Sequence, residues 1–192
     1  GTSPDGQGGI AFVILGYQSF GLFASHRVHF VASHSTYDNG KLKMALTFFR
    51  ALLRLLWLGM TRNIGWSHVH LASNGSYKRK RWLIKLARKL GSKVIIHLHG
   101  GGFQDFYAKQ NPNQQSEIRH MFTEANRVVV LSKQTASWIS ELTGKSTNIQ
   151  VVYNTVPSFE NPNAARNSQL ILFFGNLTQA NGVSDLVDVF ER

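Results

Sequence analysis

The sequence predicts an α/β fold in which a parallel β-sheet carries helices on both faces. Three observations favour this class. Short apolar runs recur along the chain, segments with helical apolar spacing lie between them, and the runs are apolar at successive positions, as in strands buried on both faces. The apolar share of 43% is enough to build a hydrophobic core.

Strands and helices are expected to alternate along the chain. Strands are predicted at residues 27–32, 67–72, 93–98, 127–131, 149–153 and 169–174. Helices are predicted at residues 9–20, 41–61, 77–90, 114–125, 133–143 and 183–192. The helix at 77–90 follows Ser76, a residue type that caps helix N-termini, and precedes Gly91, which suits the position after a helix.

The chain is expected to contain one domain and the beginning of another. Residues 1–155 hold most of the predicted elements, and residues 156–168, rich in proline and asparagine, are interpreted as a linker. Residues 169–192 supply one strand and part of a helix, which is too little for a core. The chain starts without an opening strand and stops within a predicted helix, so we interpret both ends as cut.

Positive charge is concentrated in the first half of the sequence. The formal net charge is +11, and residues 1–90 contain thirteen Lys or Arg against two acidic residues. Positive charge concentrated in this way indicates an anionic partner: nucleic acid, anionic lipid or a phosphorylated substrate. No nucleic-acid-binding motif is recognisable, so a nucleic-acid partner is not expected. The absence of cysteine excludes disulfides, zinc–thiolate sites and thiol nucleophiles.

Glycine-bearing loops precede two of the predicted helices. Gly8 and Gly9 come directly before the first apolar helix, where backbone N–H groups and the helix dipole favour a phosphate. The spacing matches neither a dinucleotide-binding fingerprint nor a Walker A loop. Gly175 and Asn176 follow the last predicted strand, and Asn181 precedes the last helix, so this loop also suits an anion.

The stretch VIIHLHGGGFQDFY places two histidines at the end of a predicted strand. His97 and His99 are two residues apart and therefore point to the same face. We interpret His97 as a hydrogen-bonded core residue. His99 stands directly before Gly100, where a ligand can approach the backbone, so we interpret it as functional. A metal pair is an alternative, but the sequence fixes no third ligand nearby, and no metal is expected.

The helix at 41–61 is apolar except for one narrow stripe. That stripe contains Lys43, Thr47, Arg50 and Arg54. The longest uninterrupted apolar run, residues 55–60, is shorter than a membrane-spanning helix requires. Two interpretations remain: a helix packed inside the domain with snorkelling arginines, or an interfacial helix lying in anionic lipid.

A basic run begins the next predicted helix, with Lys78, Arg79, Lys80 and Arg81 in succession. It is interpreted either as a solvated face or as a surface for an anionic membrane or the pyrophosphate of an acceptor. We therefore name Arg50, Arg54 and Lys78 to Arg81 as candidate residues facing the acceptor or the membrane.

Taken together, these segments resemble glycosyltransferase family 4, of the retaining GT-B fold, and within it the bacterial exopolysaccharide and capsule branch. The resemblance rests on the glycines before the first helix and on VHLASNGSYKRKRWLIKLARKLGSKVIIHLHGGGFQDFY. It continues through VVVLSKQTASWI, VVYNTV and ILFFGNLTQANGVSDLVDVFER, in the same order as in the family. It implies two Rossmann-like domains, the first mainly for the acceptor and the second mainly for a nucleotide-diphosphate sugar.

The resemblance also implies roles for individual residues. Gly8 and Gly9 would bring N–H groups to the donor diphosphate, His99 would lie near the transferred sugar, and Gly100 would leave room for it. Gly175, Asn176 and Asn181 would lie in the donor site. The two asparagines stand where basic residues are common in the family, which indicates weaker charge stabilisation there. Catalysis by such enzymes usually relies on helix dipoles and basic side chains rather than a bound metal.

The expected function is retaining transfer of a sugar from a nucleotide-diphosphate sugar to a lipid-linked glycan acceptor. The reaction would take place in surface polysaccharide biosynthesis, at the cytoplasmic face of the membrane. The 192 residues alone are expected to be inactive. The alternative is a non-catalytic or decayed transferase that binds lipid or glycan. The transferase interpretation requires His99, Gly8 and Gly9 to share one pocket.

Overall fold

The computed structural model describes residues 2–4, 6, 8–35, 37–38, 40–154, 179 and 182–190. Contacts divide the chain into two compact units, residues 1–155 and 156–192, and each is described by itself. In the second unit, helix α8 (Val183–Phe190) forms where a helix is predicted. The predicted strand at 169–174 lies outside the described residues, as do Gly175, Asn176 and Asn181.

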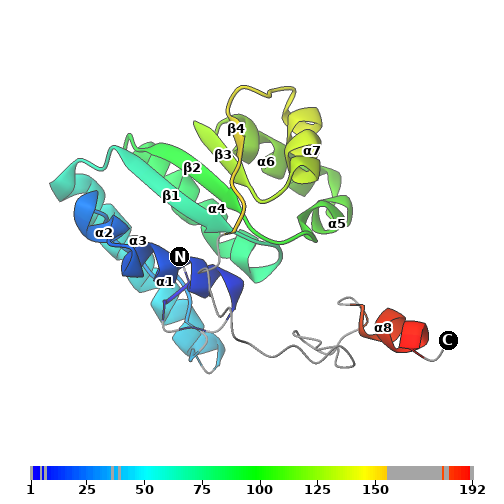
Figure 1. Ribbon diagram of the computed structural model, residues 1–192. Coiled ribbons are helices and arrows are strands. Elements are labelled where there is room, and N and C mark those ends of the chain that lie inside the picture. The colour runs from blue at the N-terminus through cyan, green and yellow to red at the C-terminus, as the bar shows by residue number, and fades with distance from the viewer. Residues whose placement is uncertain are drawn as a thin grey trace. The chain divides into compact units, whose positions relative to one another are not determined.

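A four-stranded parallel sheet forms the centre of the first unit, in the order β1-β2-β3-β4 (Figure 1). Its strands are β1 (Trp66–Leu71), β2 (Lys93–Leu98), β3 (Arg127–Val130) and β4 (Ile149–Val151). Each agrees with a predicted strand to within two residues. The register pairs His70 with His97 and Leu98 with Val130, so the carboxyl ends of the first three strands lie together.

Helices connect each strand to its neighbour. They are α4 (Gly75–Lys89), α5 (Phe103–Ala108), α6 (Pro112–Thr123) and α7 (Lys133–Thr143). Because crossovers between parallel strands are right-handed, connections that advance in one direction place their helices on one face of the sheet. The buried side chains of that face include Leu71, Val94, Ile96, Leu98 and Val130 from the strands and Ile84, Ile118, Phe122 and Ile139 from the helices. The α/β fold class is confirmed.

Three helices precede the sheet: α1 (Gly9–Ser19), α2 (Leu22–Ser25) and α3 (Lys41–Arg62). Helix α1 contributes Tyr17 to the opposite face of the sheet, where its ring contacts His68 and His70. The prediction of a strand at residues 27–32 is wrong. Arg27 has a positive φ of 50°, outside the extended region, and residues 27–32 pair with no strand in the described part of the chain.

Helix ends follow capping chemistry only in part. Ser132 caps α7, since its hydroxyl accepts a hydrogen bond from the Thr135 N–H at 3.1 Å. Gly91 follows α4 with φ of 76°, as predicted for the position after a helix. The prediction of Ser76 as the N-cap of α4 is wrong. The helix begins at Gly75, two residues before the predicted start at residue 77, and the Ser76 hydroxyl accepts from the Ala72 N–H instead.

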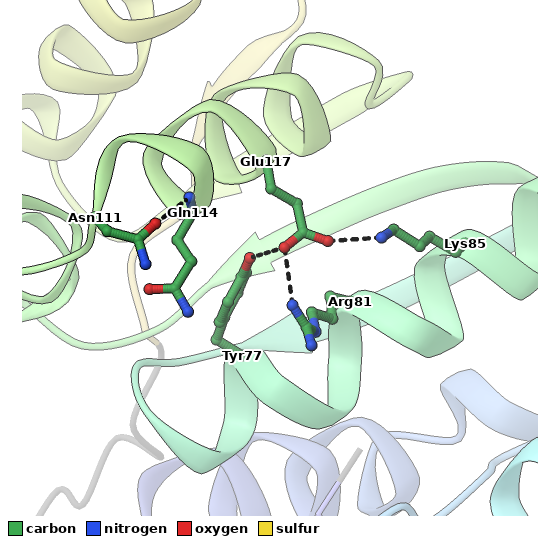
Figure 2. A network of polar contacts seen from close by, with 6 residues as sticks. All are labelled: Tyr77, Arg81, Lys85, Asn111, Gln114 and Glu117. Atoms are coloured by element: carbon green, nitrogen blue, oxygen red, sulfur yellow. Dashed lines mark hydrogen bonds and ion pairs between the residues drawn. The ribbon is translucent and has the colours of Figure 1, made fainter.

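One carboxylate fastens α4 to α6. Glu117 accepts hydrogen bonds from Tyr77 (3.2 Å), Arg81 (2.8 Å) and Lys85 (2.6 Å), as Figure 2 shows. Burial, together with the neighbouring carboxylate, raises the pKa of Tyr77 to about 12, so the phenol stays protonated and donates. Three side chains of one helix are therefore satisfied by a single acceptor on another.

We expect Glu117→Gln to lower the free energy of unfolding by about 1–2 kcal/mol, because the amide removes the charge shared by two cations. The pairs are partly exposed, which keeps the expected cost small. Urea denaturation measures it as a lower midpoint. Glu141→Gln, at an exposed position of α7, is the matched control. Equal midpoints for the two variants would show that the network contributes nothing.

Candidate functional site

Four histidines gather at the carboxyl ends of β1 and β2. His68 and His70 belong to β1, His97 belongs to β2, and His99 follows it. Alternation along each strand points all four rings to one face, and the register sets His70 beside His97. His70 Nδ1 lies 2.8 Å from His99 Nε2, and His68 Nε2 lies 3.3 Å from His97 Nδ1. Two hydrogen-bonded pairs of imidazoles result.

The imidazoles of the cluster are neutral at physiological pH. The side chains of His70, His97 and His99 are buried, with exposures of 5%, 2% and 6%. Burial, reinforced by the neighbouring rings, lowers the pKa of His97 to about 3 and that of His99 to about 4. It also lowers the pKa of His70. Each neutral ring offers one donor and one acceptor, which suits a hydrogen-bonded relay.

The cluster contains a set of potential metal ligands. His68, His70 and His97 each offer a nitrogen, and these atoms all lie within 4.8 Å of one another. In addition, His97 Nε2 is buried without a hydrogen-bond partner among the described residues. Two nitrogens on a tetrahedral Zn²⁺ with bonds of roughly 2.0–2.1 Å lie about 3.3 Å apart, similar to the His68–His97 separation. Those two nitrogens, His68 Nε2 and His97 Nδ1, are hydrogen-bonded to each other, and His70 Nδ1 is hydrogen-bonded to His99, so an ion at the three histidines has to replace a hydrogen bond or take the other ring nitrogens.

The side chain of His99 is buried in this structure, so its expected role in a ligand site stays a prediction. The ring is covered because the rings of His70 and His97 lie 5.0 and 4.1 Å from it, centroid to centroid. The backbone that follows does remain open. Gly100 has a φ of 90°, which favours glycine, and Gly100, Gly101 and Gly102 are exposed with open space where a Cβ would lie.

The glycines before α1 are open as well. Gly8 has a φ of 115°, Gly9 begins the helix, and among the described residues no atom beyond the adjoining chain lies within 4 Å of a Cβ built on either. The contact from α1 to the histidines comes from Tyr17 instead, with ring centroids 5.9 Å apart at His70. Tyr17 lies eight residues after Gly9, or about 12 Å along the helix axis at roughly 1.5 Å per residue. The required pocket shared by His99, Gly8 and Gly9 remains a prediction.

The candidate basic residues point in different directions. Arg50, Arg54 and Lys78 are exposed, whereas Arg81 is paired with Glu117. The prediction that Lys80 faces an acceptor or membrane is wrong. Its side chain is 3% exposed and donates to the Ser33 hydroxyl. Burial, with the nearby Arg79 charge, lowers the pKa of Lys80 to about 8. Successive residues of a helix turn by about 100°, so this basic run has no common face.

Helix α3 has apolar side chains on its exposed face as well as on its buried face. Ala51, Leu55 and Leu58 are buried. The opposite face carries Leu42, Leu46, Phe49, Leu53, Trp57 and Met60, all exposed, from 46% at Leu46 to 84% at Leu42. We call these six residues the outer face of α3. By length and composition alone, α3 is long and apolar enough to cross a membrane. Helix α3 also contacts α4, and Arg50 and Arg54 lie at the flank of its outer face.

The parallel sheet, its crossover helices and the open glycines at helix and strand ends define a Rossmann-like α/β domain of the kind that binds ligands at the carboxyl ends of its strands. Residues 18–155 match the family described as Glycosyl transferase 4-like domain. This match covers more than half of the chain, so the chain belongs to that family and is a glycosyltransferase domain. No curated protein and no solved structure matches the chain significantly.

Sequence reasoning missed His68 and His70 as members of the site. A signal was present: SHVHLA repeats the alternation of IIHLHG, with two histidines two residues apart at the end of an apolar run. If the two strands are neighbours in register, all four rings meet. The adjacency of the two strands, however, is set by the tertiary fold.

Proposed function

We propose that this domain forms the acceptor side of a retaining glycosyltransferase. The enzyme takes a sugar from a nucleotide-diphosphate sugar and places it on a lipid-linked glycan in surface polysaccharide biosynthesis. It works at the cytoplasmic face of the membrane, in contact with anionic lipid, and needs no metal cofactor. The proposed contact with lipid is supported by one observation, the exposed outer face of α3 with Arg50 and Arg54 beside it.

Membrane binding removes the outer face of α3 from water. Six large apolar side chains on one helix face exceed the scattered exposed apolar residues normal for a soluble surface. Lipid removes them from water, and the arginines at the flank reach anionic headgroups. A lipid-linked acceptor requires the enzyme to work at that boundary, so the same face serves both membrane binding and substrate access.

The direct test is sugar transfer. The longest natural form of the chain is incubated with a panel of UDP- and GDP-sugars and lipid-linked acceptors, and the anomeric configuration of the product is determined. Retention of configuration with a lipid-linked acceptor supports the proposal. Transfer to water-soluble acceptors alone, with equal rates in detergent and vesicles, contradicts it. The 192 residues alone are expected to show no turnover.

A non-catalytic lipid- or glycan-binding module is the second candidate, and the burial of His99 favours it. A ring sealed between other histidines binds no sugar without rearrangement. In that case the longest natural form binds anionic vesicles and yet transfers no sugar from any donor of the panel. Turnover with any donor excludes this candidate.

Membrane binding depends on the outer face of α3. We expect the double variant Leu53→Glu/Trp57→Glu to weaken binding to phosphatidylglycerol vesicles by at least about tenfold, since each change removes an apolar side chain from the interface and adds a negative charge. Flotation measures the bound fraction. Gln134→Glu together with Gln114→Glu makes the same change of charge away from α3 and is expected to retain binding. Equal losses in both variants would indicate a general charge effect.

A further inference from the structure

A groove of about 630 Å³ lies between α3 and α4, away from the histidine cluster. Phe48, Leu52, Leu53 and Leu56 line it from α3, and Trp82, Lys85, Leu86, Arg88 and Lys89 line it from α4. Its volume falls within the roughly 300–1,000 Å³ typical of small-molecule sites. The lining contains no acidic residue among the described residues.

The groove is apolar along its α3 wall and continues onto the outer face of α3 at Leu53. Beyond Leu56 and Lys89 along the two helices, α3 and α4 approach closely: a Cβ on Gly59 would lie 2.6 Å from Leu90 Cδ1. The helices are therefore in contact beyond the groove, and the open side is continuous with the surface proposed to meet lipid. A hydrocarbon chain can pass from that surface into the groove without crossing water.

The cations of the groove all belong to α4. The Lys85 amine is bound to Glu117, and Arg88 donates to the Met121 carbonyl at 2.9 Å. Lys89 is exposed and makes no ion pair among the described residues, so its charge is available to a ligand. An apolar channel with an available ammonium on one wall matches an amphiphile with a negative head.

We propose that this groove binds one hydrocarbon chain of a lipid phosphate, with the phosphate group at Lys89. The inference rests on the proposed function, which it deepens by assigning a place to the lipid part of the acceptor. A second copy of the chain is a poor occupant. Residues 1–90 carry thirteen basic against two acidic residues, and two such halves would repel each other.

Trp82 lies in the groove and provides the probe. The other three tryptophans are replaced (Trp57→Phe, Trp66→Phe and Trp138→Phe), and the fluorescence of Trp82 is followed on adding phosphatidylcholine vesicles that contain a few per cent of phosphatidic acid brominated in the chain. We expect quenching at least threefold stronger than with the same fraction of brominated phosphatidylcholine. Equal quenching by the two lipids would overturn the proposal, because it reports only general insertion.

Two substitutions test the two halves of the site. Leu86→Glu puts a carboxylate into the channel, and Lys89→Glu reverses the available charge, and each is expected to abolish the preference for phosphatidic acid. Lys133→Glu, at an exposed position of α7, is the charge-matched control and should retain it. A preference unchanged in Lys89→Glu overturns the assignment.

A second measurement keeps the proposal testable if the single-tryptophan variant does not fold. Flotation of the otherwise unmodified chain with phosphatidic acid vesicles compares Lys89→Glu with Lys133→Glu, and equal binding overturns the proposal. Sedimentation gives the oligomeric state, and a dimer abolished by Leu86→Glu assigns the groove to a second copy instead. None of these measurements uses a sugar donor. If transfer fails while the preference persists, the proposed function falls and the lipid site stands.

Discussion

Lowering the pH from 7 to 5 is expected to destabilise the protein by about 4 kcal/mol through two buried histidines. Burial holds the pKa of His97 at about 3 and that of His99 at about 4, below the ordinary value of 6.5 that the unfolded chain retains. The unfolded state therefore binds protons first as the pH falls. The contribution of these two histidines to the free energy of unfolding is fully present above pH 6.5. Below that pH it decreases by about 1.4 kcal/mol per pH unit for each histidine that stays neutral in the folded state.

The cluster offers nothing that would offset this loss. In the described part of the chain the two rings contact each other, His68 and His70, and Tyr17 contacts His68 and His70; none of these groups supplies a negative charge near pH 5. Small domains are stable by only about 5–15 kcal/mol, so a loss of this size brings the acid transition into the range of pH 5 to 4.

Circular dichroism during an acid titration gives the midpoint, and urea denaturation at fixed pH values gives the slope. His97→Gln/His99→Gln removes two of the four histidines of the cluster, whose pKa values are all lowered, and is expected to make the dependence of stability on pH between 6.5 and 5 less steep. His120→Gln, at an exposed position of α6, serves as the control. A slope as steep in the double variant as in the unmodified protein would show that other groups govern the acid transition.

The sheet could be predicted because its strands are apolar on both faces. The runs at β2 and β3 are apolar at successive positions, which favours a parallel sheet covered on both faces, and the predicted bounds agree within a residue. The run at 27–32 has the same local pattern, but a strand also needs a neighbour to pair with. Pairing is a tertiary property, so residue patterns alone could not exclude that strand.

The site could be predicted only along single strands. The alternation of His97 and His99 fixed their common face, whereas the pairing of His70 with His97 depends on register between strands far apart in sequence. The burial of His99 could not be predicted for the same reason, because one of the rings that cover it, that of His70, belongs to β1. The prediction for Lys80 is wrong for a different reason. A lysine in a basic run is expected to face solvent, but the position of Lys80 on α4 directs its side chain inward toward Ser33.

Replacing His99 by alanine is expected to lower kcat for sugar transfer by about 100-fold in the longest natural form of the chain. The ring lies directly before the open backbone at Gly100, and its hydrogen bond to His70 fixes its orientation. A positioned neutral imidazole that donates to developing charge, or that relays a proton, contributes about 10²–10⁴ in rate. If its interaction strengthens in the transition state, kcat falls while the KM of the donor changes little.

Because His99 is buried, a structural role has to be separated from a chemical one. His99→Ala also leaves His70 without its partner, so part of any loss reflects a looser cluster. His70→Gln removes the same hydrogen bond to an imidazole while keeping the His99 ring, and a positioning role predicts a smaller loss of kcat than His99→Ala causes. His120→Ala controls for the loss of a histidine elsewhere. Losses of kcat that only parallel the losses of melting temperature in both cluster variants would mean that His99 belongs to the core, and that the reacting sugar lies elsewhere.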